Sequence, residues 1–390
     1  MKIATIVGAR PQFVKAAVVS RPLRRLAREV LVHTGQHYDA NMSDVFFAEL
    51  EIPSPDYHLA VGSAPHGEQT GEMLKQIERV LLAEKPDSVL VYGDTNSTLA
   101  GALAAAKLHI PVAHVEAGLR SFNRRMPEEV NRVVTDHLSS LLFAPTDAAV
   151  FNLEREGLTA GVCHVGDVMY DAALHYLEQA RKRSKVLERC QLRPGEYVLA
   201  TLHRAENTDE PGRLRSIMSA FIEVSREAPV VFPVHPRTRR LIDALPQVPG
   251  GSLLMIEPVS YFDMLQLESS ARCIVTDSGG VQKEAFFFRV PCVTTRDESE
   301  WVETLETSWN TLAGADAARI VSAVRKASPG SSGAWPYGRG NSAQQIVHVL
   351  TSGALPPLDI LARTSGPFHE RVMVRPRTSS VTTHPDNPLS

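Results

Sequence analysis

Short apolar runs alternate with amphipathic segments along most of this sequence, and this alternation restricts the fold more than any other feature. In the first half, the runs predicted to be buried strands are residues 3–7, 30–33, 57–61, 88–92, 111–115, 141–144 and 162–165. Between them, the spacing of apolar residues predicts helices, most clearly over 68–84, 97–108 and 127–140. Strands that alternate with helices form parallel, doubly wound sheets, so the pattern predicts an α/β fold.

A second alternation follows, with predicted strands at 197–202, 230–234, 253–256, 273–276 and 291–295. A chain of 390 residues is also too long for one ordinary domain. We therefore expect two Rossmann-like domains, residues 1–168 and 169–340, with a final helix at about 341–352 placed to pack back on the first domain. The tail at 364–390 is rich in Ser, Thr, Pro and Arg and lacks periodicity, which predicts disorder.

The turn Asp277-Ser278-Gly279-Gly280 follows a predicted strand and precedes a predicted helix. Glycines let the backbone approach a ligand closely, and the free N–H groups at a helix start attract anions. The turn is therefore a candidate site for a phosphate or diphosphate, and Glu284 nearby could accept hydrogen bonds from a ribose. The alternative is that Ser278 is only an N-cap and that the glycines only shape the turn.

Other polar residues also follow the ends of predicted strands. They are Arg10, Lys15, Asp94, Glu116, His203, Arg204, His235, Arg237 and Arg296. Ligands of open parallel sheets bind at the carboxyl ends of the strands. Two such sheets facing each other would bring these groups into one cleft, and this concentration favours the phosphate interpretation of the glycine turn.

Several kinds of protein and site are disfavoured. The net charge of −3 argues against a nucleic-acid-binding protein. The turn after the first strand is Gly8-Ala9-Arg10-Pro11 rather than GxGxxG, there is no P-loop, and no His, Asp or Glu cluster has metal-ligand spacing. We therefore expect no metal and no other obligatory cofactor. The N-terminus enters a strand without a signal peptide and no apolar run could span a membrane, so we expect a cytoplasmic protein without membrane association.

Six short motifs together resemble one enzyme family. They are Gly8-Ala9-Arg10-Pro11 with Lys15, Gly93-Asp94-Thr95, HVEAGLR at 114–120, MPEEVNR at 126–132, HRAEN at 203–207 and the Asp277-Ser278-Gly279-Gly280 turn. Each motif alone is weak, but their number and order over residues 1 to about 350 are specific. On these motifs the chain resembles the non-hydrolysing UDP-N-acetylglucosamine 2-epimerases.

The resemblance implies a glycosyltransferase-B-like fold, in which two Rossmann-like domains hold the ligand in a cleft between them. It also implies interconversion of UDP-GlcNAc and UDP-ManNAc without NAD. UDP is eliminated in anti fashion across C1 and C2 to give a 2-acetamidoglucal, and it then adds back while a proton reaches the other face of C2. This chemistry needs a base, an acid and stabilisation of the charge on the leaving diphosphate.

The resemblance also implies roles for residues at matching positions. The implied catalytic residues are Asp94, Glu116, Glu128 and His203. The implied UDP-binding residues are Arg10, His203, Ser278, Gly279, Gly280 and Glu284, with Lys15 and Arg132 as further cationic candidates. Which carboxylate is the acid and which is the base stays open.

Several of these residues also have a structural interpretation. Asp94 could cap the helix that follows it, and Glu128 could interact with a helix dipole in a first turn. His203 could be a buried histidine with satisfied hydrogen bonds. Lys15 could be an exposed helix lysine, and Arg132 could pair only with glutamates one turn earlier.

Two segments, after the first strand and at 295–310, differ from the commonest pattern of the family. Both resemble the branch that acts on modified sugars such as UDP-2,3-diacetamido glucuronic acid. A uronate needs an extra cation near C6, for which Arg296 or Arg10 could serve. The substrate therefore stays open between UDP-GlcNAc and such a relative. Phe262 invites stacking on uracil, but we prefer a core position for it.

Substrate activates some family members allosterically, through glutamines in the loop after the second strand. In this chain the loop keeps Gln36 and His37 but has Asp39 where a second glutamine is expected, which argues against activation. Arg204 and His235 are the other candidates for an activator site.

Three functions remain open at this point. The first is the epimerase, the second is a hydrolysing relative that releases UDP and the free 2-epimer sugar, and the third is a non-catalytic regulator that binds a nucleotide sugar. A regulator would not need Asp94, Glu116, Glu128 and His203 together, so the epimerase is favoured. The family resemblance also implies a homodimer.

Overall fold

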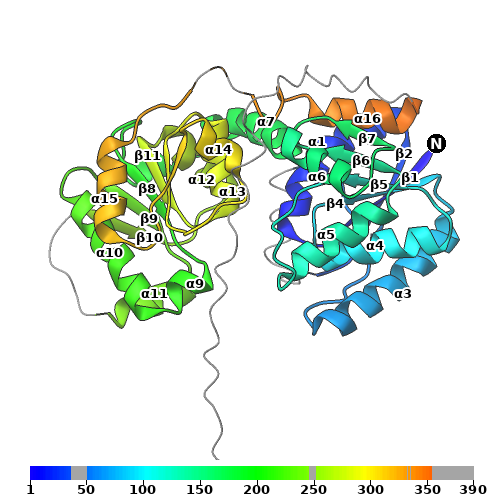
Figure 1. The fold of residues 1–390 in the computed structure, drawn as a ribbon, viewed down its shortest axis with the longest axis horizontal. Coiled ribbons are helices and arrows are strands. Elements are labelled where there is room, and N and C mark those ends of the chain that lie inside the picture. The colour runs from blue at the N-terminus through cyan, green and yellow to red at the C-terminus, as the bar shows by residue number, and fades with distance from the viewer. Residues whose placement is uncertain (37–50, 246–251, 332, 334, 354–390) are drawn as a thin grey trace, which may run out of the picture. The chain divides into compact units, whose positions relative to one another are not determined.

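The computed structural model describes residues 1–36, 51–245, 252–331, 333 and 335–353, and the side chain of Arg10 lies outside this description. His37 and the tail at 364–390 also lie outside the described residues, and so do the predictions made for them. Within the described part, two parallel sheets with helices on their faces confirm the predicted α/β fold (Figure 1).

The first sheet has seven parallel strands in the order β3-β2-β1-β4-β5-β6-β7. They are β1 (Lys2–Val7), β2 (Arg28–His33), β3 (Tyr57–His58), β4 (Ser88–Tyr92), β5 (Val112–Val115), β6 (Leu141–Ala144) and β7 (Val162–His164). Strand β1 pairs with β2 on one side and with β4 on the other, so the strand order reverses between β1 and β4. Open sheets of this kind bind ligands outside the carboxyl ends of the strands at such a reversal.

Helices cover both faces of this sheet, because alternate residues of its strands are buried on opposite sides. The helices are α1 (Arg10–Leu26), α3 (His66–Glu84), α4 (Asn96–Lys107), α5 (Pro127–Leu138), α6 (Asp147–Arg155) and α7 (Val168–Arg183). Leu90 and Tyr92 of β4 join a cluster with α1 and α7, whereas Val89 and Val91 join a cluster with α3 and α4. The near-continuous apolar run of β4 is thus explained by burial on both faces.

The second sheet has six parallel strands in the order β10-β9-β8-β11-β12-β13. They are β8 (Val198–Thr201), β9 (Val230–Pro233), β10 (Leu253–Ile256), β11 (Cys273–Thr276), β12 (Cys292–Thr294) and β13 (Asn310–Leu312). The order reverses between β8 and β11, as it does between β1 and β4. The second sheet therefore repeats the pattern of the first, and its reversal lies beside the glycine turn that follows β11.

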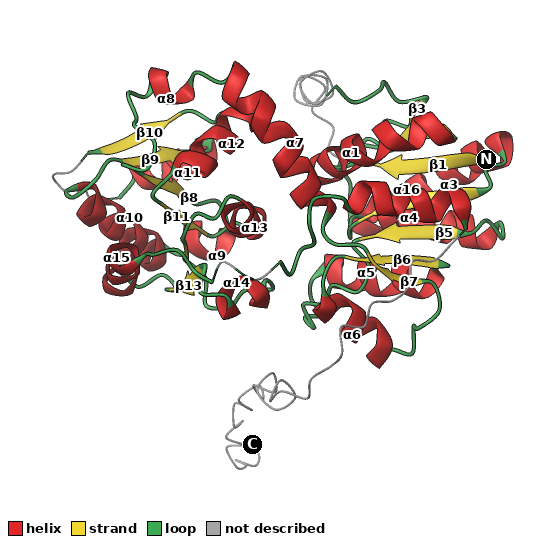
Figure 2. Ribbon diagram, turned by 90° about the horizontal axis from the view of Figure 1, so that it is seen from above, coloured by secondary structure: helices red, strands yellow, loops and turns green. Residues whose placement is uncertain are grey.

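The helices of this part are α8 (Val186–Arg189), α9 (Ala205–Thr208), α10 (Pro211–Ser225), α11 (Pro236–Asp243), α12 (Tyr261–Ser270), α13 (Gly279–Phe287), α14 (Val302–Glu306) and α15 (Ala317–Lys326). Helices α10 and α15 lie side by side on one face (Figure 2) and bury one apolar cluster with the sheet. Helices α12 and α13 bury another cluster against alternate strand residues. Both faces of the second sheet are therefore covered as well.

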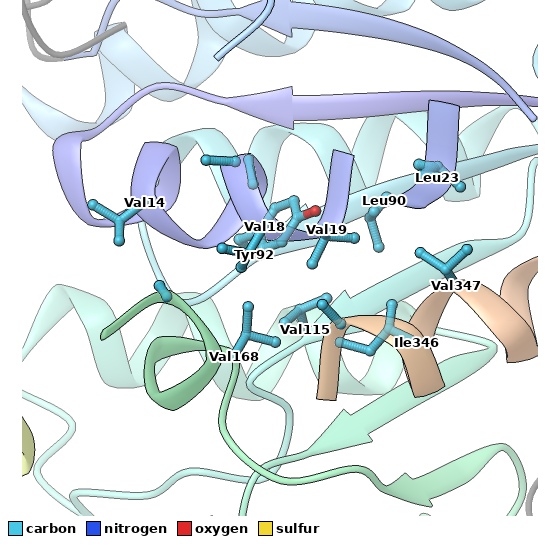
Figure 3. Close-up of a cluster of buried hydrophobic side chains, with 14 of the residues drawn as sticks. Val14, Val18, Val19, Leu23, Leu90, Tyr92, Val115, Val168, Ile346 and Val347 are labelled. Atoms are coloured by element: carbon cyan, nitrogen blue, oxygen red, sulfur yellow. The ribbon is translucent and has the colours of Figure 1, made fainter. Parts of the chain in front are cut away.

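The last described helix, α16 (Ser342–Ser352), returns to the first sheet, although it follows the second in sequence. Ile346 and Val347 of α16 belong to the same apolar cluster as Val18 and Leu23 of α1 and Val115 of β5 (Figure 3). In Figure 1 this helix lies beside α1. Burial of its apolar face explains why the chain crosses back.

Most predicted strands and helices agree with the structure to within about two residues, but β13, α6, α14 and α15 are absent from the prediction. Strand β13 is only Asn-Thr-Leu, which carries no alternating apolar pattern. A side-chain network fixes it instead, since Asn310 accepts from Thr294 Oγ1 at 2.7 Å and donates to Gln282 Oε1 at 3.1 Å. Such a network between distant segments cannot be read from local sequence.

Candidate active site

Glu116 lies directly after β5 in a backbone conformation that is uncommon for a residue with a side chain. Its φ is +72°, in the left-handed region, and Gly118 follows with φ +82°. The N–H groups of Glu116 and Ala117 both donate to the carbonyl oxygen of Phe143, each at 3.1 Å, and so hold this turn against β6. Non-glycine residues at positive φ cluster at functional sites, where the surrounding structure sustains the strain.

Two lysines face the carboxylate of Glu116. Lys15 of α1 donates to Oε2, and the Nζ atom of Lys283 of α13 lies 3.5 Å from Oε1. Burial by itself would raise the pKa of Glu116, but the two ammonium groups lower it to about 2. Glu116 is therefore a carboxylate at neutral pH, and Lys15 is buried rather than an exposed helix lysine.

Lys283 also binds Asp167, with 2.7 Å between Nζ and Oδ2. Burial would lower the pKa of Lys283, but the carboxylates of Asp167 and Glu116 raise it above its ordinary value. The four charged side chains of Lys15, Glu116, Lys283 and Asp167 thus form one buried chain of ion pairs. Lys283 and Asp167 are absent from the sequence-based candidates.

A second buried network holds the turns after β4 and β5 in place. His114 of β5 has Nδ1 2.7 Å from Asp136 Oδ1 and Nε2 2.7 Å from the carbonyl oxygen of Gly93. The other oxygen of Asp136 accepts from Gly118 N at 3.0 Å and pairs with Arg120 at 2.7 Å. A single histidine-carboxylate pair therefore connects the residue before Asp94 to the turn that carries Glu116.

Gly93 needs to be glycine for two reasons. Its φ is +62°, and a Cβ atom there would lie 3.3 Å from Glu116 Oε2 and 3.5 Å from Lys15 Nζ. The backbone at Gly93, the residue before Asp94, thus lies close to the ion pair between Lys15 and Glu116.

Asp94 forms an ion pair with Arg132 of α5, and its carbonyl oxygen accepts from Asn131 Nδ2 at 2.9 Å. Asp94 does not cap α4, because the N-cap is Thr95, whose side chain accepts from Thr98 N. Arg132 also lies 3.5 Å from Glu129, as the pairing interpretation expects. Asp94 therefore stands with a cation beside the turn that carries Glu116.

Glu128 is exposed in the first turn of α5, where it is well placed to interact with the helix dipole. Glu129, the next residue, is buried and accepts from Ser121 N at 2.8 Å and Phe122 N at 3.0 Å. In the described part of the chain, Glu128 has neither a hydrogen bond nor an ion pair through its side chain. The structure thus does not bring Glu128 into contact with Glu116 or Asp94.

Asp277 organises the start of the glycine turn after β11. It is fully buried and accepts from the backbone N–H groups of His203, at 3.1 Å, and Arg204, at 2.9 Å. His203 Nδ1 lies 3.3 Å from Asp277 Oδ1, yet the His203 side chain is 55% exposed, so it is not a buried histidine. Asp277 thereby joins the turn after β8 to the turn after β11, at the reversal of the second sheet.

Ser278 is the N-cap of α13, and its hydroxyl accepts from Val281 N at 3.4 Å. A Cβ atom on Gly279 would lie 2.6 Å from Glu300 Oε1 and 3.2 Å from Trp301 Nε1, whereas one on Gly280 would, among the described residues outside its own helix backbone, meet only Ser278 Oγ, at 3.8 Å. Glu300 thus places a carboxylate beside the helix start, where backbone N–H groups favour an anion.

Glu300 is held by two arginines. Arg296 Nη1 lies 2.8 Å from its Oε2, and Arg204 lies 3.9 Å from its Oε1. Arg296 also lies 3.6 Å from Glu206. Burial would raise the pKa of Glu300, but Arg296 lowers it below the ordinary value. Arg296 and Arg204 are therefore both engaged by carboxylates of the chain itself.

Glu284 lies further along α13 and is buried. Burial raises its pKa to about 7, although Lys283 opposes this. Glu268 of α12 is fully buried, and in the described part of the chain neither of its carboxylate oxygens has a hydrogen-bond partner. Burial raises the pKa of Glu268 well above its ordinary value, and the neighbouring Glu284 adds to this.

The remaining candidates have local structural contacts. Gln36 Oε1 accepts from Ser97 N at 3.0 Å and from Ser97 Oγ at 2.7 Å, which attaches the loop after β2 to α4. His235 caps α11, and its Nδ1 accepts from Arg237 N at 3.3 Å. Phe262 is buried beside Tyr176, which agrees with a core position.

Two further findings concern only the described residues. No group of three or more His, Cys, Asp or Glu side chains there is arranged to hold a metal ion. No helix there has the length and apolarity needed to cross a membrane.

Known proteins resemble this chain over most of its length. The family model described as UDP-N-acetylglucosamine 2-epimerase matches residues 23–351. A UDP-N-acetylglucosamine 2-epimerase homolog of Methanococcus maripaludis is 54% identical over 358 residues, which cover 90% of this chain and 99% of the relative. The UDP-2,3-diacetamido-2,3-dideoxy-D-glucuronate 2-epimerase of Pseudomonas aeruginosa is 54% identical over 333 residues, 83% of this chain and 92% of the relative.

Solved structures agree with these similarities. The Methanocaldococcus jannaschii UDP-GlcNAc 2-epimerase in complex with UDP-GlcNAc and UDP is 46% identical, with a TM-score of 0.79 over 90% of this chain and 100% of that one. The Neisseria meningitidis UDP-GlcNAc 2-epimerase bound to UDP-GlcNAc is 31% identical, with a TM-score of 0.80 over 90% of this chain and 100% of that one. The chain belongs to the UDP-N-acetylglucosamine 2-epimerase family, whose members are isomerases.

Proposed function

We propose that this protein interconverts UDP-GlcNAc and UDP-ManNAc without hydrolysing them. One observation supports this most strongly. Lys283 belongs to the helix that begins at the glycine turn, the candidate anion site, and its ammonium group contacts Glu116 after β5 of the other sheet. One helix therefore begins at the candidate diphosphate site and contacts the candidate acid-base carboxylate.

In the proposed reaction, a base removes the proton from C2 while the bond between C1 and the diphosphate oxygen breaks. The electrons of the C2–H bond form the C1–C2 double bond, and UDP leaves with the electrons of the C1–O bond. UDP then adds back to C1, and an acid delivers a proton to the opposite face of C2. The reaction has no net oxidation or reduction, so we propose that it needs no redox cofactor.

We propose that Glu116 and Asp94 act at C2. The low pKa of Glu116 makes it a carboxylate before substrate binds, which suits a base. Asp94 stands beside the same turn with Arg132 as its counter-ion. Glu128 is the alternative partner for Glu116, since it is exposed and has no competing contact within the described residues.

We propose that the diphosphate binds at the start of α13, beside the backbone N–H groups of Gly279 and Gly280 and the hydroxyl group of Ser278, whose own N–H donates to Thr276 Oγ1 at 2.9 Å. His203 is half exposed beside Asp277 and can reach the same ligand. Arg10 and Lys15, at the start of α1, are the further cationic candidates, and Glu284 is the candidate for the ribose. Glu300 stands beside Gly279, so the diphosphate has to displace its carboxylate.

The experiment for this function is incubation of the purified chain with UDP-GlcNAc, followed by separation of products and proton NMR. Growth of UDP-ManNAc to an equilibrium with UDP-GlcNAc, without free UDP, supports the non-hydrolysing epimerase. Free N-acetylmannosamine with stoichiometric UDP identifies the hydrolysing reaction instead. Binding of UDP-GlcNAc without any product identifies a non-catalytic binder.

A second substrate is favoured by one specific comparison. The P. aeruginosa relative that is named for UDP-2,3-diacetamido-2,3-dideoxy-D-glucuronate is 54% identical to this chain, which equals the identity of the M. maripaludis UDP-N-acetylglucosamine 2-epimerase homolog and exceeds the 46% of the M. jannaschii UDP-N-acetylglucosamine 2-epimerase. In the structure Arg296 is held by Glu300 and Glu206, so it can meet a uronate only if Glu300 moves. Parallel assays with both sugars decide between them, and the better substrate has the higher kcat/KM.

We also propose that residues 1–168 and 169–340 form two domains of a cytoplasmic homodimer. The reversals at β1/β4 and at β8/β11 support two separate sheet units. Size-exclusion chromatography with light scattering tests the dimer, for which the expected mass is about twice the 42.7 kDa of one chain. Cell fractionation tests the location.

A further inference from the structure

We propose that Lys283 is a positioning residue for Glu116, which fixes the orientation of this carboxylate and helps to keep it ionised. The inference rests on the proposed function, because it assigns Glu116 to the chemistry at C2. It adds a role for Lys283 that the family resemblance does not supply.

The two oxygens of Glu116 each face a different lysine. Lys15 donates to Oε2, and Lys283 Nζ lies 3.5 Å from Oε1. A carboxylate that is held on one oxygen can still rotate about its side-chain bonds, whereas a contact on each oxygen fixes the plane of the group. Lys283 therefore completes the orientation that Lys15 begins.

The position of Lys283 does not depend on Glu116 alone. Its ammonium group lies 2.7 Å from Asp167 Oδ2, while Asp167 Oδ1 accepts from Met169 N at 2.8 Å and caps α7. Asp167 is fully buried, and Lys283 Nζ and Met169 N each hold one of its two carboxylate oxygens. The ammonium is thus anchored to the start of α7 and presented to Glu116 from there.

Burial distinguishes this lysine from a surface residue or a simple phosphate ligand. Lys283 is only 4% exposed, and a buried ammonium is costly unless it is paired. Besides Asp167 and Glu116, the ring of Trp301 lies 4.2 Å from Nζ. Two carboxylates and an aromatic ring therefore surround the ammonium, which suits a group that acts through other side chains.

The charged groups around Glu116 and Lys283 come from four elements. Lys15 of α1, Lys283 of α13 and Arg132 of α5 are all cations, and Asp167 at the start of α7 faces Lys283. These cations hold the pKa of Glu116 at about 2 against the effect of burial. Removing Lys283 therefore raises the pKa of Glu116, by about one to three units for an opposite charge at this range.

Lys283 also connects Glu116 to the proposed diphosphate site. It lies three residues after Gly280, which corresponds to about 4.5 Å along the helix axis. A ligand that moves the start of α13 therefore moves the ammonium that orients Glu116. The base would be aligned best when the diphosphate is bound.

The test compares Lys283→Met with Lys283→Arg in the full chain, with Lys75→Met as the control, since Lys75 is exposed and pairs only across one turn with Glu72. We expect Lys283→Met to lower kcat about 100-fold, as a misplacement of about 1 Å does. We expect the acid limb of kcat/KM to move to higher pH by about one to three units. Lys283→Arg should keep the acid limb of the wild type and recover at least a tenth of its kcat, and Lys75→Met should match the wild type.

Calorimetry with UDP separates positioning from ligand binding. We expect the UDP affinity of Lys283→Met to stay within about threefold of the wild type. A loss above about thirtyfold would make Lys283 a ligand of the diphosphate and overturn the inference, and so would an unchanged acid limb with kcat within twofold. If Lys283→Met does not fold by circular dichroism, Asp167→Asn removes the anchor and keeps an N-cap residue. Its kcat should fall about tenfold, and an unchanged kcat would overturn the inference.

Failure of the proposed function and failure of the role of Lys283 give different experimental results. If wild-type protein does not epimerise either sugar, the proposed function is wrong. In that case carbon NMR of labelled glutamate carboxyls still measures Glu116 in the wild type and in Lys283→Met. An equal pKa of Glu116 in both proteins would contradict the charge effect without any activity measurement.

Discussion

The two glycines at the start of α13 should respond in opposite ways to the same substitution. A methyl group on Gly279 would lie 2.6 Å from Glu300 Oε1 and 3.2 Å from Trp301 Nε1. Within the described part of the chain, a methyl group on Gly280 would meet Ser278 Oγ, at 3.8 Å, and no other atom outside the helix backbone within 4 Å. Neither glycine has a positive φ, so alanine suits the backbone at both positions.

The magnitudes follow from packing and from helix propensity. Gly280→Ala should stabilise the fold by about 0.5–1 kcal/mol, because alanine is the better helix residue. Gly279→Ala gains no more than that and loses about 1–3 kcal/mol through overpacking against Glu300 and Trp301. Its free energy of unfolding should therefore fall by up to about 3 kcal/mol, and least if the Glu300 carboxylate can turn aside.

The effect on ligand binding should not follow stability. Among the described residues, the Cβ of Gly280→Ala would have only Ser278 Oγ within 4 Å outside the helix backbone, and under the proposed function the diphosphate approaches the helix N–H groups through this space. Loss of one charge-assisted hydrogen bond costs about 1.5–3 kcal/mol, which corresponds to a 10- to 100-fold weaker UDP affinity. The assays are urea unfolding for stability and calorimetry for UDP. A Gly280→Ala protein that is stable and binds UDP as tightly as the wild type would show that the diphosphate does not lie at this turn.

Three further predictions concern single groups of the site. Burial and Glu284 raise the pKa of Glu268 in the folded state, so the free energy of unfolding of the wild type should fall as pH rises above about 4.5. In urea unfolding, the free energy of Glu268→Gln should depend less steeply on pH, by at most about 1.4 kcal/mol per pH unit. Equal slopes would contradict this assignment. Glu300→Gln should bind UDP up to about fivefold more tightly in calorimetry, because Arg296 and Arg204 lose their carboxylate partner, and weaker binding would instead make Glu300 a ligand of the nucleotide. Initial rates should be hyperbolic in UDP-GlcNAc because Gln36 is bound to Ser97, and sigmoidal rates would contradict this.

The sequence predicts the architecture well, because an apolar run that is buried on both faces of a sheet, such as β4, can be recognised from that segment alone. It also predicts the neighbourhood of Asp94 and Glu116, since both follow strands whose carboxyl ends meet at one edge of the sheet. However, the position of a candidate residue after the end of a strand does not determine where its side chain points. Glu128 is exposed at the start of α5, and the buried glutamate beside it serves the preceding loop.

The ion-pair chain could not be predicted in the same way. Lys283 follows the glycine turn within a helix, and a lysine there is ordinarily read as a solvated residue. A signal does exist, because most of its neighbours in α13 are apolar and buried, including Ala285 and Phe286, and a lysine among them needs a buried partner. Which carboxylates serve as that partner depends on Asp167, more than a hundred residues earlier, and only the fold brings the two together.

The measurement that tests the central claim most directly is the C2 label of the product. Wild-type protein is incubated with UDP-GlcNAc in deuterated water, and the UDP-ManNAc formed is examined by proton NMR and mass spectrometry, with Glu116→Gln in parallel. The account predicts one deuterium at C2 of each UDP-ManNAc molecule, no accumulation of free UDP, and a rate about 10²- to 10⁴-fold lower for Glu116→Gln. UDP-ManNAc that keeps its original hydrogen at C2, or a Glu116→Gln protein as fast as the wild type, would contradict it.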